Sequence, residues 1–245
     1  MGLSQDSAAR PRSTGAGKSK ILIMRLTTDR ERSIACSIKS VLWGIGSMAT
    51  ASELPIAVFL SGSGTTLQNL IDARARGLLP VRIVQVVASK EGVGGIEKAR
   101  RAGLPIEVIA RKSFPSTETY SERLFEVCRS AGAKLVCLAG FLQLLRIPDD
   151  FHHRVLNIHP ALLPAFGGKG MYGHHVHEAV LASGAKVSGC TVHYADNEFD
   201  HGPVIMQRTV PVLDDDTPET LAARVFEQEC IAYPEAIRLF AEGKL

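Results

Sequence analysis

The sequence lacks the patterns that mark several protein classes. It has no CxxC pair, and its apolar runs all fall short of the roughly 20 residues that a membrane-spanning helix needs. Most of its cysteines lie within apolar runs, which indicates buried free thiols in a reducing compartment. We therefore expect a soluble, cytoplasmic protein. The five cysteines are Cys36, Cys128, Cys137, Cys190 and Cys230.

A strong charge of either sign is also missing. The formal net charge is +3, but residues 1–47 hold eight Lys and Arg against three Asp and Glu, which leaves 20 basic and 22 acidic residues after them. A nearly neutral remainder offers no field of Lys and Arg to neutralise phosphates. We expect small-molecule substrates, neither nucleic acid nor membrane as a partner, and a monomer or homodimer.

Residues 1–47 also lack the periodicity of a folded segment. They are rich in Ser, Gly, Ala and Arg, which is typical of a disordered arm and resembles an organelle transit peptide. A start of translation at Met48 is a third interpretation. We treat residues 1–53 as an extension that is disordered or not translated, and residues 54–245 as the folded domain.

From Pro55 onward, short apolar runs alternate with segments of helical spacing. Strands alternating with helices through short loops predict an α/β fold, a doubly wound and mostly parallel sheet with helices on both faces. Ligands in such sheets bind beyond the carboxyl ends of the strands. Strands are expected at Ile56–Leu60, Val81–Ser89, Pro105–Ala110 and Lys134–Gly140, and helices near Leu67–Gly77, Gly95–Ala102 and Ser116–Ser130.

A glycine-rich loop, Ser61–Thr66 (SGSGTT), follows the first predicted strand. Its glycines let the backbone approach a ligand, and free N–H groups at the start of the next helix favour an anion. The loop is neither a P-loop nor a full GxGxxG motif, because GK[ST] is missing and Leu67 occupies the last glycine position. It suits a phosphate monoester; the alternative is a tight turn in which Thr65 or Thr66 caps the helix.

The stretch Val155–Gly170 (VLNIHPALLPAFGGKG) begins with a predicted strand that places Asn157 and His159 on the same side. Farther on, an acidic loop between two predicted strands carries Asp200. These residue types suit acyl transfer to an amine, since an amide N–H stabilises the developing oxyanion, a histidine moves protons and a carboxylate fixes its tautomer. No GxSxG motif is present, which favours direct transfer. The alternative is that all three are turn caps and core residues.

Five motifs in this order resemble phosphoribosylglycinamide formyltransferase: FLSGSGTTLQNLID, LAGFLQLL, LNIHPALLPAF, SGCTVHYADNEFDHGPVIMQ and RVFEQECIAYPEAI. The resemblance covers Pro55–Leu245. It implies a Rossmann-like formyltransferase fold and transfer of formyl from 10-formyltetrahydrofolate, a co-substrate, to the amine of 5'-phosphoribosylglycinamide in de novo purine biosynthesis. It implies no metal.

The resemblance also implies roles for individual residues. Asn157, His159 and Asp200 match the catalytic residues, with His159 as general acid/base in a direct attack by the amine. The ribonucleotide would contact Gly64, Thr65, Thr66 and Glu229. The folate would contact Leu142, Gln143, Leu144, Leu145, Asn157, Asp196, Asn197, Glu198, Phe199 and Asp200.

Two positions depart from the family pattern. Thr66 stands where Asn is common, and Thr117 aligns near a basic residue that some members use for the folate glutamate tail. Arg111 or Lys112 could substitute for that residue.

The segment AFGGKGMYGHHVHEAV is longer than in some members. Its glycines predict a flexible flap over the site, leading into a helix that begins near His177. The histidines of this segment lack Cys or carboxylate partners at metal-ligand spacing. Strand alternation points another histidine, His193, inward near Asp200.

Three competing interpretations share parts of this pattern. Formyltetrahydrofolate deformylase uses the same chemistry with water as acceptor, but residues 1–47 are too short for its βαβ regulatory module. Methionyl-tRNA formyltransferase needs a basic C-terminal domain, whereas this sequence ends in a short predicted helix, PEAIRLFAEGKL. A binding module without activity is the third, and the joint presence of Asn157, His159 and Asp200 argues against it.

Overall fold

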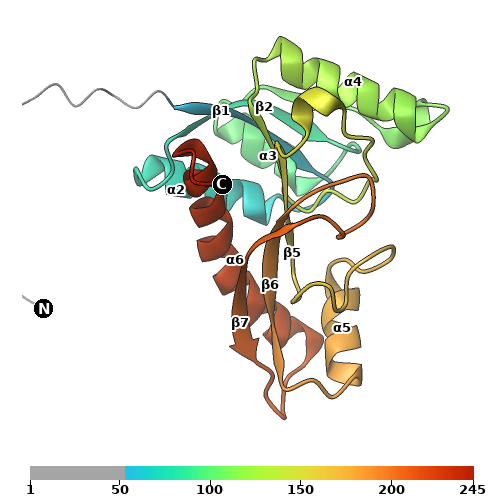
Figure 1. Ribbon diagram of the computed structural model, residues 1–245, viewed down its shortest axis with the longest axis vertical. Helices are drawn as coiled ribbons and strands as arrows, with labels where there is room; N and C mark the ends of the chain where they lie inside the picture. The colour runs from blue at the N-terminus through green and yellow to red at the C-terminus, as the bar shows by residue number, and fades with distance from the viewer. Residues whose placement is uncertain (1–52) are drawn as a thin grey trace, which may run out of the picture. The chain divides into compact units, whose positions relative to one another are not determined.

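Seven strands form one sheet in the order β3-β2-β1-β4-β5-β6-β7 in the computed structural model, which describes residues 53–245 (Figure 1). The strands from β3 to β5 pair in parallel, whereas β6 is antiparallel to β5 and β7 is antiparallel to β6. The predicted α/β class with a mostly parallel sheet is confirmed. The strands are β1 (Leu54–Leu60), β2 (Val81–Ala88), β3 (Ile106–Val108), β4 (Leu135–Leu138), β5 (Val155–His159), β6 (Val187–Tyr194) and β7 (Val204–Pro211).

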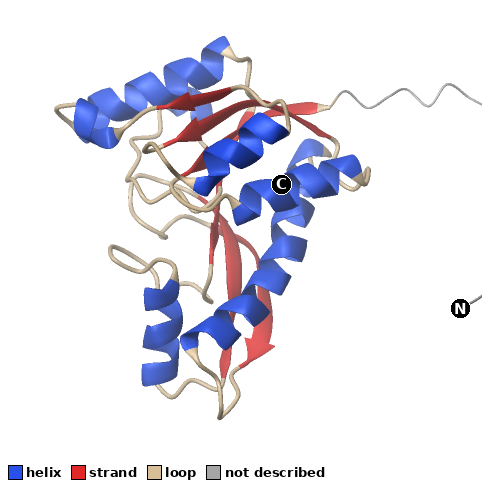
Figure 2. Cartoon of the chain, turned by 180° about the vertical axis from the view of Figure 1, so that it is seen from behind, coloured by secondary structure: helices blue, strands red, loops and turns tan. Residues whose placement is uncertain are grey.

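Helices cover both faces of this sheet, as Figure 2 shows. One buried cluster packs α2, α3 and α6 against one face, and a second packs α4 against the other. Residues 1–52, which include most of the predicted extension, lie outside the described residues, so the domain boundary stays a prediction. The helices are α2 (Thr65–Ala75), α3 (Gly94–Arg101), α4 (Thr117–Ser130), α5 (His174–Ala182) and α6 (Pro218–Ala241), with short 3-10 helices η1 (Arg111–Ser113) and η2 (Asp149–Phe151).

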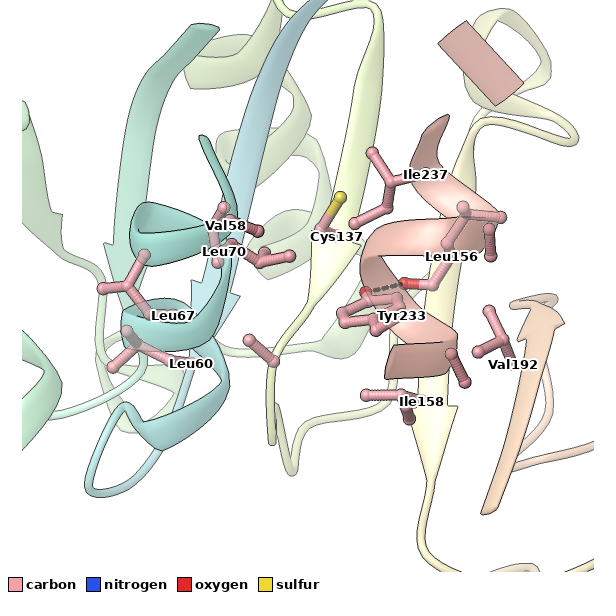
Figure 3. Packing of buried hydrophobic residues seen from close by; sticks show 14 of the residues in the cluster. Val58, Leu60, Leu67, Leu70, Cys137, Leu156, Ile158, Val192, Tyr233 and Ile237 are labelled. Carbon is pink, nitrogen blue, oxygen red and sulfur yellow. Dashed lines mark hydrogen bonds between the residues drawn. The ribbon is translucent and has the colours of Figure 1, made fainter. Parts of the chain in front are cut away.

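Strand alternation divides the core between the two faces. In β1, Val58 and Leu60 pack into the cluster under α2 and α6, while Phe59 points to the α4 side. Tyr233 of α6 is fully buried in the first cluster, and its hydroxyl hydrogen is shared between the carbonyl oxygens of Leu156 (2.9 Å, Figure 3) and Leu138 (3.0 Å). Tyr233 therefore ties α6 to the last residue of β4 and to the first half of β5.

Helix α6 is longer than the short helix predicted at the end of the sequence, because it continues through Pro234. A proline inside a helix removes the N–H that would bond to the carbonyl four residues earlier. That carbonyl belongs to Cys230, and the side-chain Nδ2 of Asn69 in α2 donates to it at 3.1 Å. A tertiary contact thus satisfies the group that Pro234 leaves without a partner.

Two other helix starts differ from the sequence predictions. Neither Thr65 nor Thr66 caps α2, because Gly64, in the left-handed conformation (φ 72°), is the N-cap and has no side chain to donate or accept. Helix α5 begins at His174, three residues before the predicted start, after Gly173, which also has a positive φ. In both places glycine dihedrals that sequence patterns do not specify set the first turn.

Cys128, Cys137 and Cys190 are buried free thiols, and Cys230 is half-buried and also free. Cys36 lies outside the described residues. No helix within residues 53–245 is both long enough and apolar enough to cross a membrane.

Candidate active site

A cavity of about 590 Å³ opens at the carboxyl ends of the parallel strands. The strand order reverses between β1 and β4, and ligands of doubly wound sheets bind at such a reversal. The predicted catalytic residues and the start of α2 line this cavity together, although they are far apart in the sequence. The predicted residues in its wall are Thr65, Thr66, Leu142, Asn157, His159, Phe199, Asp200 and Glu229.

The pairing of β5 with β6 fixes the positions of the first two polar residues. Asn157 lies opposite His193, and His159 lies opposite Thr191. Because alternate residues of a strand share a face, Asn157 and His159 project from the same side, as predicted. The buried neighbours Leu156 and Ile158 point to the other face, into the core under α6.

Asp200 enters the site from the loop between β6 and β7. Its backbone is left-handed (φ 53°), a conformation that aspartate adopts more readily than most residues. Its Oδ1 lies 3.4 Å from Nδ1 of His159, and its Oδ2 accepts a hydrogen bond from the Gly168 N–H at 3.0 Å. Burial alone would raise the pKa of Asp200, but these two contacts outweigh it and hold the pKa below its ordinary value, so the group is a carboxylate.

Both ring nitrogens of His159 face oxygen atoms. Nε2 lies 2.8 Å from the carbonyl oxygen of Phe166, and since a carbonyl only accepts, Nε2 carries a proton. Nδ1 faces the Asp200 carboxylate, and the side chain is almost fully buried. The contact with Phe166 was not predicted, because it depends on how the chain turns back after β5.

The hydrogen-bond roles of His193 determine which way the Asn157 amide points. Nδ1 of His193 lies 2.9 Å from the Tyr194 carbonyl, so Nδ1 is the donor and Nε2 the acceptor. Burial lowers the pKa of His193, which keeps the ring neutral. The amide Nδ2 of Asn157 therefore faces His193 Nε2 at 2.9 Å, and it also donates to Asp200 Oδ1 at 3.2 Å. The expected inward direction of His193 is confirmed.

The start of α2 depends on backbone contact. A Cβ atom on Gly64 would lie 2.5 Å from the Cα of Gly95, so only glycine allows α2 and α3 to meet here. The Gly95 N–H donates to the Gly62 carbonyl at 3.1 Å, and the Ser89 hydroxyl donates to the Ser61 hydroxyl at 2.7 Å. These contacts hold Thr65 and Thr66 at the cavity wall, although Gly64 itself is not among the lining residues of the described part.

Helix α6 contributes Glu229 to the same cavity. Burial raises the pKa of Glu229 to about 7, so its carboxyl exchanges a proton near neutral pH. Phe226, three residues earlier on the same helix face, also lines the cavity and was not predicted. The spacing from Glu229 is the signal that could have found it.

A smaller pocket, about 50 Å³, adjoins the main cavity, and four residues line both: Phe141, Asn157, Phe199 and Asp200. The remaining predicted folate residues lie mainly here. Asn197 lines neither space within residues 53–245, but its Oδ1 accepts a hydrogen bond from the Ile147 N–H at 2.8 Å. Asn197 thus ties the acidic loop to the segment after β4. The other predicted residues around this pocket are Gln143, Leu144, Leu145, Asp196 and Glu198.

Arg111 lies beside the position that departs from the family pattern. Its Nη2 is 3.4 Å from the hydroxyl of Thr117, and its guanidinium lies over the Tyr120 ring at 5.9 Å. The side chain of Arg111 thus reaches the region where the sequence lacks a basic residue at position 117.

No group of three or more His, Cys, Asp and Glu residues in the described part is arranged to hold a metal ion. In the first turn of α5, His174 and His177 line the main cavity, and His175 contacts Glu178 on the surface of the helix.

Comparison with known proteins identifies the family. The formyl transferase family model matches residues 54–237. A phosphoribosylglycinamide formyltransferase, chloroplastic, from Arabidopsis thaliana is 40% identical over 203 residues, which cover 82% of this chain and 70% of that protein. A trifunctional purine biosynthetic protein adenosine-3 from Drosophila pseudoobscura pseudoobscura is 43% identical over 195 residues, but the chain spans only 14% of its length.

A solved structure agrees with these relatives. The crystal structure of glycinamide ribonucleotide transformylase 1 from Symbiobacterium toebii has 43% sequence identity and a TM-score of 0.73, covering 78% of this chain and 89% of that one. The chain therefore belongs to the formyl transferase family, as a transferase that resembles its phosphoribosylglycinamide formyltransferases.

Proposed function

We propose that this protein transfers a formyl group from 10-formyltetrahydrofolate to the amine of 5'-phosphoribosylglycinamide, for de novo purine biosynthesis. One observation carries the proposal. Asn157, His159 and Asp200 meet on the wall of a cavity that Thr65 and Glu229 also line. Groups suited to formyl transfer thus share one space with groups suited to a phosphorylated amine.

The two substrates would enter from the two connected spaces. The ribonucleotide phosphate would bind at the start of α2, where N–H groups and the Thr65 and Thr66 hydroxyls are available. The pterin would occupy the smaller pocket, against Leu145 and the acidic loop. Asn157 and Asp200 belong to the wall of both spaces, so the formyl carbon and the amine would meet there.

In the proposed reaction the amine nitrogen attacks the formyl carbon, and the carbonyl electron pair moves onto oxygen. Asn157 would donate to that oxygen by exchanging its contact with Asp200 for one with the substrate. Both N–H groups of Asn157 are otherwise engaged, so this exchange is a required step.

The protons would move through His159. The attacking nitrogen loses one proton and the departing N10 of the folate gains one as its bond to the formyl carbon breaks. His159 would first change tautomer, so that Nδ1–H donates to the Asp200 carboxylate and Nε2 turns from the Phe166 carbonyl to the substrate. Nε2 would then accept the proton of the amine and return it to N10. Glu229 would contact the glycinamide group.

An assay of purified protein tests the proposal. Absorbance measures the consumption of 10-formyltetrahydrofolate. We expect consumption only when 5'-phosphoribosylglycinamide is present, with one formylated product formed per folate released. Consumption without the ribonucleotide would indicate a hydrolase that uses water as acceptor. No consumption under either condition would contradict the transferase proposal. The cytoplasmic location and the monomeric or homodimeric state stay predictions.

A further inference from the structure

Lys169 is the only lysine or arginine that lines the main cavity among the described residues 53–245. The same cavity contains the carboxyl groups of Asp200 and Glu229. A substrate with a doubly charged phosphate would have to enter a space that holds acidic groups. None of the ligand-binding residues that the resemblance implies is a lysine or arginine that could balance the charge of the phosphate.

The backbone around Lys169 is ordered by specific contacts. Residues 168–171 form a tight turn in which the Met171 N–H donates to the Gly168 carbonyl at 3.0 Å. Gly170 has φ 92°, the positive value that the third position of a type II turn requires. The Gly168 N–H donates to Asp200, so the base of the turn is fixed to a predicted catalytic residue. Lys169 therefore projects from a turn with a defined position relative to the reacting groups.

The charge of Lys169 is free for a ligand. No carboxylate of the described residues lies within 4.0 Å of its Nζ, whereas Lys186 pairs with Asp214 at 3.0 Å. The histidines of the cavity do not replace it. Burial lowers the pKa of His177, and His174 lies 3.8 Å from Glu219. Lys169 is thus the one lysine or arginine of this space within residues 53–245, and it has no carboxylate partner there.

We propose that Lys169 binds the phosphate group of the acceptor ribonucleotide, an inference that rests on the proposed function. The phosphate is preferred over the folate carboxylates because Lys169 lines the cavity together with Thr65 and Thr66 and does not line the smaller pocket. The turn at residues 168–171 would supply a cation to the phosphate, and Thr65 and Thr66 at the start of α2 would supply neutral donors.

The experiment compares two acceptors, the ribonucleotide and the riboside that lacks its phosphate. In Lys169→Met we expect kcat/KM for the ribonucleotide to fall about 10- to 100-fold, as for loss of a charge-assisted hydrogen bond, and kcat/KM for the riboside to stay unchanged. Lys169→Arg should retain most of the activity. Lys186→Met is the matched control, because its charge lies in an exposed ion pair away from the cavity.

Lys98 is the rival cation. Its Cδ lies 3.5 Å from where a Cβ on Gly64 would be, yet Lys98 does not line the cavity in the described part. A phosphate-dependent loss in Lys98→Met with none in Lys169→Met would overturn the proposal. An equal loss for both acceptors in Lys169→Met would do the same, since it would indicate a role other than phosphate binding. Failure of the wild-type protein to use either acceptor would instead contradict the proposed function.

Discussion

The start of α2 and the end of β5 line the same cavity, but different kinds of interaction shape them. At the start of α2, glycines pack backbone against backbone, as Gly64 does against Gly95. At the end of β5, side chains with donors and acceptors hold one another, as His159 and Asn157 do through Asp200. At Gly64 the first arrangement leaves no room for an added carbon atom, whereas the second depends on which side-chain atoms donate and accept hydrogen bonds.

This difference separates the expected effects of mutation. Changes at the start of α2 should affect the free energy of unfolding first and activity as a consequence. Changes at the end of β5 should affect turnover while the fold remains intact. Four predictions test the separation, from the largest expected effect to the smallest.

His159→Ala and Asp200→Asn should each lower kcat by about 10²- to 10⁴-fold, because proton transfer and the orientation of the ring are lost. Thermal unfolding should show both variants folded. His175→Ala is the matched control, since His175 is exposed and contacts Glu178 and the Tyr172 ring, not the predicted catalytic residues. Turnover near the wild-type rate in either variant would remove that residue from the proposed mechanism and would break the comparison.

Gly64→Ala should lower the free energy of unfolding by about 2–4 kcal/mol, because the new Cβ meets the Gly95 backbone and φ is positive. Gly62→Ala is the control within the same loop. Nothing lies within 4 Å of a Cβ at that position, and a change within about 0.5 kcal/mol is expected. Urea unfolding measures both variants, and equal stability of the two would contradict the role assigned to backbone contact.

Glu229→Gln should change how stability depends on pH. The folded pKa of about 7 is raised above the unfolded value of 4.5, so the folded state binds the proton more tightly. The contribution of Glu229 to the free energy of unfolding should therefore be greatest below pH 4.5, fall as the pH rises to 7 and level off above it.

Relative to Glu229→Gln, the wild-type protein should lose about 1–3 kcal/mol between pH 5 and pH 8, which urea unfolding at the two pH values measures. Glu227→Gln, two residues away on the same helix and exposed, should show the wild-type dependence. Parallel pH curves for the wild-type and Glu229→Gln proteins would show that the carboxyl is not desolvated by the fold.

Asn197→Ala should raise KM for the folate substrate about two- to tenfold, because the loss of one hydrogen bond to Ile147 loosens the wall of the smaller pocket. Asn197→Asp retains an acceptor oxygen and should stay close to the wild-type KM. A kcat effect as large as that of Asp200→Asn would mean that the acidic loop acts as a single unit, which would sharpen the contrast with α2.

The sequence predicted β1 and β4 well because these strands are mostly buried on both faces and are continuous apolar runs. It also predicted that Asn157 and His159 share a side, since strand alternation requires it. It could not predict that α6 continues through Pro234, because the compensating donor, Asn69, comes from α2. The contact of His159 with Phe166 and the position of Lys169 depend in the same way on how the chain folds back.

The segment that follows β5 contacts His159 and Asp200 through main-chain atoms: the Phe166 carbonyl accepts from His159, and the Gly168 N–H donates to Asp200. Amino-acid replacements leave main-chain atoms in place, so most side chains of this segment can vary without disturbing either contact. The glycines are exceptions, because a Cβ on Gly167 would meet the Leu163 side chain at 2.5 Å and because Gly168 and Gly170 have positive φ. The segment is thus a suitable place to engineer acceptor preference while the reaction centre is left as it is.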